Sequence, residues 1–228
     1  MIRRLLFLDI ETIPVKYTFS ELTEKEKKLW TAKWRFNPDL NPEEQYQKAG
    51  IFSEFSKVIC IGLGYIDDNN TIHLKCLFHE DERVLLNAFN DSLNKFFQHT
   101  FKKYNAEYSL CAHNGREFDF PFLCRRMLIN NIAVPDVLKS GRKEYLQDTM
   151  EMWKFGDYKH YTSLDLLAHV FDIDSPKDNL DGSMVAKAFY ELNQKEEIQE
   201  YCLKDVATLI KVYQKLNSLP LSTEISFQ

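Results

Sequence analysis

The stretch Leu5-Leu6-Phe7-Leu8-Asp9-Ile10-Glu11-Thr12 decides the fold, because an apolar strand here runs directly into two acidic side chains. Residues 4–10 are apolar except at the ends, which is typical of a buried β-strand. Since side chains alternate across a strand, Asp9 and Glu11 are expected on one face. Two carboxylates about 4 Å apart repel by about 4 kcal/mol at an effective dielectric near 20, so a divalent cation would stabilise them. For this pattern alone, the alternative that both acids lie in water beyond the strand is favoured.

Patterns on the C-terminal side of this stretch predict an α/β fold with a central mixed β-sheet flanked by helices. The order is a strand, a long insert, two strands, a helix, a strand, a helix and then further helices. The expected strands cover 57–66, 71–78 and 108–112, with a hairpin turn at 67–70. The expected helices cover 82–103, a segment starting near Pro121, a segment capped by Thr162, and 196–216.

The insert at about 14–56 contains two patterns that are typical of helix starts. Thr23 is followed three residues later by Glu26, and Asn41 is followed directly by Pro42. Internal repeats, low-complexity tracts and a clear linker are absent from the sequence. We therefore expect residues 1–228 to form a single domain with this insertion.

Composition restricts the classes of function. The chain has 28% charged and 44% hydrophobic residues, as in soluble globular proteins. Its formal net charge of -5 argues against a protein that coats nucleic acid, because such proteins carry basic stripes. The charge does not exclude an enzyme that grips phosphates through metal ions, since bound cations reverse the local charge.

The five cysteines form no CxxC pair, and most have apolar neighbours. This pattern predicts buried free thiols in a reducing compartment, with neither a zinc site nor a disulfide framework. The apolar run at the N-terminus ends at Asp9, which is too short for a secretory signal, and no segment has the length of a membrane span. We expect a cytoplasmic protein without a membrane partner.

Two more acids extend the pattern. Asp119 lies among phenylalanines just before Pro121, where a helix N-cap is an equally good explanation. On the last helix, Asp205 lies within the arc of Ile198, Cys202, Val206 and Leu209, and Tyr201 lies one turn earlier at its edge. A carboxylate on a core-facing side is unfavourable unless it is paired or coordinated. Asp9, Glu11, Asp119 and Asp205 could therefore hold two divalent cations, Mg²⁺ or Mn²⁺.

The motifs LFLDIET (6–12), N-x-x-x-F-D-x-P-F-L-x-R-R (114–126) and Y-x-x-x-D (201–205) resemble the three motifs of the DEDD exonuclease superfamily. The closest likeness is to stand-alone relatives of the proofreading exonuclease domain of family B DNA polymerases. The resemblance implies a ribonuclease H-like (DnaQ-like exonuclease) fold and two-metal hydrolysis of a 3′-terminal phosphodiester. It implies that Asp9, Glu11, Asp119 and Asp205 are the metal ligands and that Tyr201 orients the attacking water.

The histidine subclass of this superfamily has its histidine at the position of Glu200, so the chain is similar to the tyrosine (DEDDy) subclass. The resemblance also implies that Asn114 and Phe118 contact the substrate strand. Thr12 and Ile13 come just after the first two acids and could touch the terminal nucleotide. For Phe118, a place in the core is at least as well supported. The role of the 14–56 insertion is not implied.

A second candidate substrate surface is the segment 139–161, in which Lys and Arg alternate with aromatic residues. Such segments bind single strands, but many exposed loops have the same composition, and the second explanation is slightly favoured. His160 is near enough to the expected site to be of interest. Asp148 and Asp181 are expected to be structural, as a strand-end acid and a helix cap.

The leading hypothesis is a metal-dependent 3′–5′ exonuclease that acts on the 3′ end of single-stranded DNA, with a role in DNA repair as one expectation. An exoribonuclease is the alternative, because contacts to a 2′-hydroxyl cannot be read from the sequence. A catalytically silent nucleic-acid-binding module is disfavoured, since all four acids and the tyrosine are present. The sequence leaves the oligomeric state open.

Overall fold

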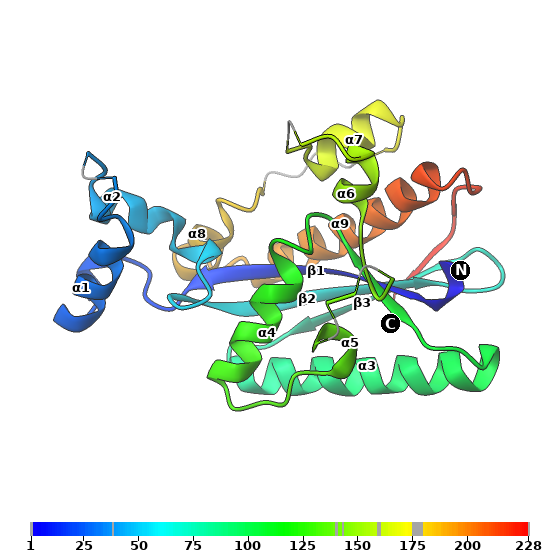
Figure 1. Cartoon of the computed structure of the whole chain (residues 1–228), viewed down its shortest axis with the longest axis horizontal. Coiled ribbons are helices and arrows are strands. Elements are labelled where there is room, and N and C mark those ends of the chain that lie inside the picture. The colour runs from blue at the N-terminus through cyan, green and yellow to red at the C-terminus, as the bar shows by residue number, and fades with distance from the viewer. Residues whose placement is uncertain are drawn as a thin grey trace.

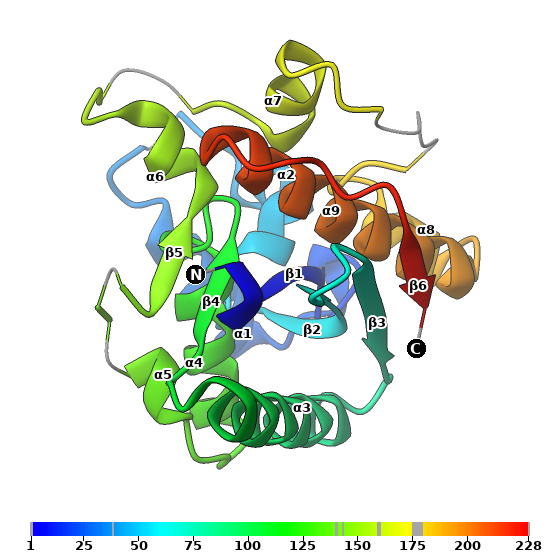
Figure 2. The ribbon, with the colours of Figure 1, turned by 90° about the vertical axis from the view of Figure 1, so that its right-hand side faces the viewer.

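A computed structural model describes residues 2–37, 39–139, 141–142, 144–158, 161–174 and 180–227 of the chain. Its centre is a six-stranded mixed sheet in the order β5-β4-β1-β2-β3-β6 (Figures 1 and 2). Strands β1, β2 and β3 pair antiparallel, while β4 is parallel to β1 and β5, and β6 is parallel to β3. The strands are β1 Leu5–Pro14, β2 Ser56–Ile66, β3 Ile72–Phe78, β4 Ser109–Ala112, β5 Leu146–Asp148 and β6 Ile225–Phe227.

Helices cover both faces of the sheet, as the end-on view of the strands shows (Figure 2). Helix α3 packs on one face and α9 on the other, which confirms the predicted α/β class with a mixed sheet. The helices are α1 Glu24–Lys33, α2 Pro42–Gln45, α3 Glu82–Tyr104, α4 Asp119–Ile129, α5 Asp136–Lys139, α6 Thr149–Lys154, α7 Leu164–Val170, α8 Val185–Tyr190 and α9 Lys195–Leu216, with short 3₁₀ turns η1 Ile2–Arg4, η2 Phe19–Glu21 and η3 Tyr46–Ile51.

Strand β1 alternates between the two hydrophobic layers. Leu6, Leu8 and Ile10 belong to the core under α3. Leu5 and Phe7 belong to the core under α9, and the same alternation turns the next two odd-numbered side chains, both acidic, to the α9 face. The strand continues to Pro14, beyond the predicted end at residue 10. The acids therefore lie inside a paired strand, and the explanation that they extend into water beyond its end is wrong.

Two glycines in β2 let α9 approach the sheet. A Cβ atom at Gly62 would lie 2.8 Å from Val206 Cγ2 and 3.0 Å from the backbone oxygen of Cys202. At Gly64 it would lie 2.7 Å from Val206 Cγ1. Helix backbone cannot yield as a flexible side chain can, so Gly62 sets the height of α9 above the sheet, and Gly64 leaves room for the packed side chains of Val206 and Ile210.

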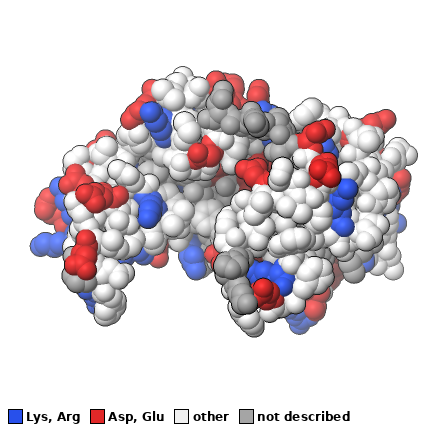
Figure 3. Space-filling view, turned by 90° about the horizontal axis from the view of Figure 1, so that it is seen from above, with Lys and Arg blue, Asp and Glu red and all other residues white. Residues whose placement is uncertain are grey.

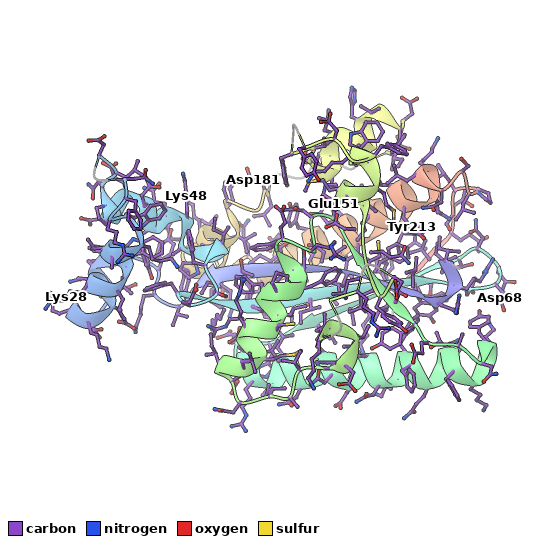
Figure 4. The ribbon with its side chains drawn as sticks, viewed as in Figure 1. Lys28, Lys48, Asp68, Glu151, Asp181 and Tyr213 are labelled. Carbon is purple, nitrogen blue, oxygen red and sulfur yellow. The ribbon has the colours of Figure 1, made fainter. Side chains whose placement is uncertain are left out.

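Residues 15–55 form a helical segment at one end of the molecule, with Lys28 and Lys48 far from Asp68 at the β2–β3 turn (Figure 4). Its centre is the fully buried Trp30, which packs edge-on against Trp34, Tyr46, Phe52 and Phe55. The Thr23 capping box and the Asn41 cap predicted for this segment are both present. The assignment of residues 1–228 to a single domain stays a prediction.

Some predicted boundaries need correction. The helix expected to be capped by Thr162 is capped by Ser163, whose hydroxyl accepts the Leu166 N–H. The helix expected near Pro121 begins at Asp119. Elements α5, α6 and β6 were not expected, because short segments carry too little periodicity. Within the described part of the chain, no helix combines the length and the apolar character needed to cross a bilayer.

Candidate active site

Four acidic side chains from three elements meet above β1. Asp9 and Glu11 come from β1, Asp119 from the start of α4, and Asp205 from α9. Glu11 and Asp119 are buried, with 6% and 3% of their surface exposed. Burial raises the pKa of Asp9 well above its usual range, and the charges of Glu11, Asp119 and Asp205 raise it further. The pKa of Glu11 is raised by burial and by two of the same neighbours. The tertiary structure thus brings all four predicted ligands together.

Ligand atoms of Asp9, Glu11 and the buried thiol of Cys202 all lie within 4.8 Å of one another. The Cys202 Sγ atom is 3.6 Å from the Asp9 carbonyl oxygen and 3.8 Å from Asp9 Oδ2. The sequence identified Cys202 only as a core residue of the helix. The only indication in the sequence that Cys202 would reach the acids is that it lies on the same core-facing side of the last helix as Asp205.

Asp119 reaches β1 from the first residue of α4. Phe118 occupies the N-cap position, so the explanation of Asp119 as an N-cap is wrong. Its carboxylate instead accepts the backbone N–H of Ile10, and this bond lowers its pKa. Burial dominates, however, and raises the pKa of Asp119 to about 7. The acid is therefore tied to β1 between Asp9 and Glu11.

A side chain on β5 holds the loop that precedes α4. Asp148 accepts the backbone N–H groups of Asn114 at 2.9 Å and Arg116 at 3.0 Å, and it also caps α6 through Met150. Asn114 adopts a positive φ of 58°, which asparagine tolerates well. The predicted structural role of Asp148 as a strand-end acid is confirmed. Asp181 accepts the N–H of Ser183 in the turn before α8, whose N-cap is Met184, so Asp181 caps the turn and not the helix.

On α9, Tyr201 and Asp205 lie one turn apart and are hydrogen-bonded. Burial raises the pKa of Tyr201 above its usual value of 10.0, and the charges of Asp205, Glu11 and Asp9 raise it further. The hydroxyl is thus protonated at neutral pH and donates its proton to the Asp205 carboxylate, which leaves its oxygen free to accept a hydrogen bond. Glu200, at the position of the subclass-defining histidine, is exposed.

The four residues expected to contact substrate differ in how accessible the structure leaves them. Thr12 is half-buried and its hydroxyl donates to the Gly50 carbonyl at 2.8 Å, which joins the insertion to the first motif. Ile13 has no exposed surface and packs under α8, so this placement does not support a contact of its side chain with a nucleotide. Phe118 is half-buried and packs on Phe122. Asn114 Oδ1 is buried and has no hydrogen-bond partner among the described residues.

The segment 139–161 divides into core and surface parts. Trp153 packs edge-on against Phe171, whereas Phe155, Tyr158 and Tyr161 are 87%, 98% and 67% exposed. Partial desolvation raises the pKa of Tyr161, and the charges of Asp119 and Asp9 raise it further, so this aromatic side chain lies within electrostatic range of the acids. Ser140, Lys143, Lys159 and His160 lie outside the described residues. Seen from above, the face over the sheet is hollowed near its middle, with acidic atoms at the rim (Figure 3).

A model of the RNase H superfamily matches residues 47–217, which is well over half of the chain. The chain belongs to the RNase H superfamily. The match does not include β1, so it says nothing about Asp9 and Glu11. No curated protein matches the sequence significantly.

This RNase H-like chain is also similar in structure to the family B DNA polymerase from the hyperthermophilic archaeon Pyrobaculum calidifontis. The TM-score is 0.60 at 14% identity, over 93% of this chain and 24% of the polymerase chain. The chain therefore spans about a quarter of that polymerase, and the likeness, at this identity, shows the fold. The ribonuclease H-like fold expected from the three motifs is confirmed.

The donor set of this RNase H-like chain suits hard divalent cations. Oxygen ligands from carboxylates are those that Mg²⁺ and Mn²⁺ prefer. The raised pKa values of Asp9, Glu11 and Asp119 show that the buried acids lack compensating positive charge. A superfamily whose nucleases generally use divalent metals, together with this acidic cluster, supports a metal site here, without fixing the identity of the metal.

Metal binding is expected to stabilise the protein, and more so at higher pH. The pKa values of these acids are higher in the folded protein than in the unfolded chain. The free energy of unfolding of the metal-free protein therefore falls as the pH rises from about 4 through the folded pKa values, of which that of Asp119 is about 7. At 100 times its Kd a ligand adds about 2.7 kcal/mol, or roughly 5–10 °C in Tm for a chain of this size. In thermal melts, Mn²⁺ should raise the Tm by this amount at pH 8 and by clearly less at pH 5. An equal shift in Asp205→Asn would contradict a clustered site.

Proposed function

We propose that this protein is a metal-dependent 3′–5′ exonuclease of the tyrosine subclass, which removes nucleoside 5′-monophosphates from the 3′ end of single-stranded DNA. One observation carries the proposal: four carboxylates from β1, α4 and α9 converge, with the protonated Tyr201 hydrogen-bonded to one of them. RNase H superfamily membership is consistent with a nuclease. The raised pKa values of Asp9, Glu11 and Asp119 mean that these acids have little value for stability at neutral pH, and this favours a catalytic explanation.

The four acids and Tyr201 would have different roles in catalysis. Asp9, Glu11, Asp119 and Asp205 would hold two ions of Mg²⁺ or Mn²⁺, which when bound supply charge to the scissile phosphate and activate water. Tyr201 stays protonated at neutral pH and so cannot act as a base, and its hydroxyl positions the attacking water by accepting a hydrogen bond from it. Asp205 orients this hydroxyl.

The terminal nucleotide would lie between the first motif and the α4 loop. The buried Asn114 Oδ1 offers a hydrogen-bond acceptor that is still unpaired among the described residues. Tyr161 is two-thirds exposed and lies within electrostatic range of Asp9 and Asp119, and its ring provides a surface on which a terminal base could stack. The Tyr161 ring favours a single-stranded 3′ end, because a base can stack on the protein only when it is not paired or stacked within a duplex.

The test uses single-stranded DNA and RNA of one sequence, labelled at the 5′ end, with Mg²⁺, Mn²⁺ or EDTA. We expect a ladder that shortens from the 3′ end with either metal, and faster on DNA than on RNA. A circular single strand serves as the control and should remain intact. Cleavage in EDTA or cutting of the circle would overturn the proposal, whereas faster degradation of RNA would move it to the exoribonuclease alternative.

Replacing Tyr201 by phenylalanine should lower kcat by up to about a hundredfold, because the water loses its positioning hydrogen bond. KM and the Mn²⁺-induced shift in Tm should be unchanged, since the ring and the four acids remain. Single-turnover cleavage at saturating metal measures the first effect. A change in metal affinity equal to the loss in rate would mean that Tyr201 acts only by holding Asp205.

A further inference from the structure

His113 joins the end of β4 to two other parts of the chain. It directly follows Ala112, the last residue of β4, and it is half-buried. Its ring is hydrogen-bonded through Nδ1 to the Thr149 hydroxyl and through Nε2 to the Thr162 carbonyl oxygen, both at 2.8 Å. Thr149 is the fully buried first residue of α6, and Thr162 lies just before the cap of α7. The ring therefore links the sheet to the segment 161–163.

The two partners decide which ring nitrogen of His113 carries the proton. A carbonyl oxygen accepts but cannot donate, so Nε2 must donate its N–H to Thr162. In the neutral ring, Nδ1 then accepts the hydroxyl proton of Thr149. Burial lowers the pKa of His113 below its usual 6.5, against the smaller opposing effects of Thr162 and Asp148. The ring is thus neutral at pH 7, and a single tautomer satisfies both partners.

The hydrogen bond from His113 fixes the segment 161–163 to the sheet. Ser163 uses its hydroxyl and its carbonyl inside α7, which it caps. Across the described ranges, no other hydrogen bond runs from these three residues to a strand or to its end. Tyr161 directly precedes Thr162 and is 67% exposed, so packing holds its ring only weakly. The position of the Tyr161 ring therefore depends on the Thr162 carbonyl and on His113.

The Tyr161 ring lies where a terminal base is expected. The charges of Asp119 and Asp9 raise the pKa of Tyr161, so the ring is within electrostatic range of the predicted metal ligands. A base gains free energy by stacking on an aromatic ring, but the gain is smaller when the ring must first be ordered. Anchoring the backbone beside Tyr161 removes part of that cost before DNA binds.

We propose that His113 is a positioning residue for substrate binding, which acts through the Thr162 carbonyl and holds the Tyr161 ring in place for the 3′-terminal base. This role rests on the proposed nuclease function and adds a residue that lies just outside the second motif. His113 takes no part in the chemical step, because both of its ring nitrogens are used by Thr149 and Thr162. Loss of the anchor therefore raises KM and leaves kcat unchanged.

Two amide substitutions separate the two hydrogen bonds of the ring. In His113→Gln the side-chain amide reaches the position of Nε2 and can still donate to the Thr162 carbonyl. In His113→Asn the shorter side chain reaches only the position of Nδ1, so the bond to Thr149 is kept and the anchor is lost. For single-stranded DNA we expect His113→Asn to raise KM about tenfold, as for the loss of one base-stacking contact, with kcat within about twofold. His113→Gln should keep KM close to that of the unaltered protein.

Two comparisons show whether His113 acts through Tyr161. If it does, His113→Asn should raise KM no further in a Tyr161→Ala background, because the effects of coupled residues are not additive. On a strand whose 3′-terminal nucleotide lacks its base, His113→Asn and the unaltered protein should have equal KM, since no base is present to stack. Fully additive effects of the two substitutions, or the same rise in KM on the abasic strand, would overturn the proposal.

His169→Asn is the matched control, because His169 is an exposed histidine on α7 and the chemical change is the same. It should leave KM and kcat unchanged. The Mn²⁺-induced shift in Tm should be equal in His113→Asn and the unaltered protein, because the four acids remain in place. A smaller shift in His113→Asn would mean that His113 only supports the loop before Asp119, and the proposal would fail.

The hydrogen bonds of His113 can be tested without a substrate. In the full chain, nitrogen-15 chemical shifts distinguish protonated from unprotonated ring nitrogens, and the signals of His113 are those that disappear in His113→Gln. At pH 7 we expect a protonated Nε2 and an unprotonated Nδ1, and the opposite tautomer would overturn the proposal because Nε2 could not donate to Thr162. A protein without nuclease activity would overturn the proposed function, whereas an active enzyme with unchanged KM in His113→Asn would overturn only the role of His113.

Discussion

Replacing Asp9 or Asp205 by alanine should lower exonuclease activity by more than about a hundredfold at saturating Mg²⁺. Loss of groups that merely orient a metal ligand already reduces affinity or activity 10–100-fold, and a ligand itself matters more. Both acids lie in one electrostatic group, as the raised pKa of Asp9 shows. The rate of release of labelled mononucleotides is the measurement.

Glu200→Ala is the matched control for these variants. Glu200 precedes Tyr201 on the same helix and carries the same charge as Asp205, but it is exposed. Its removal should change the rate by less than twofold or so, as is usual for surface substitutions. If Asp205→Ala kept full activity in Mg²⁺, or if Glu200→Ala were equally damaging, the assignment of the four acids would be wrong.

Replacing Arg126 by alanine should lower the free energy of unfolding by about 3–5 kcal/mol, because it leaves the buried carboxylate of Glu82 without its positively charged partner. Arg126 and Glu82 are 8% and 5% exposed in their side chains. The guanidinium donates to Glu82 at 2.9 and 2.6 Å and to the Ser53 carbonyl at 2.7 Å. Glu82 in turn accepts the N–H of Val58 at 2.8 Å, so the pair joins α3, α4, β2 and the insertion.

Arg125 provides the control, since it is the exposed neighbour on the same helix. Arg125→Ala should change the free energy of unfolding in urea by no more than about 0.5 kcal/mol. The Arg126 variant should also lose metal-induced stabilisation, because α4 carries Asp119. A loss below about 1 kcal/mol for Arg126→Ala would show that Glu82 can be neutralised or hydrated at little cost.

The candidate ligands could be identified from the sequence because each carries a local signal. Alternation in β1 placed Asp9 and Glu11 on one face, and the helical arc placed Asp205 beside buried residues. Ile13 was misassigned because its position next to the motif predicts proximity, while the burial of its side chain depends on the packing of α8 against β1, which the sequence did not reveal. The contact of Cys202 with Asp9 was missed for the same kind of reason, because the two residues are 193 positions apart in the sequence.

The sequence by itself determined the α/β class, the long insert and the identity of the four acids, because hydrophobic periodicity and side-chain chemistry are local properties. Only the tertiary structure decided that Asp119 binds β1 through the Ile10 N–H, and that Cys202 Sγ lies 3.8 Å from Asp9 Oδ2. These contacts depend on strand register and on the close approach of α9 over Gly62. Register and approach are set by packing across the whole sheet, and no short stretch of sequence contains that information.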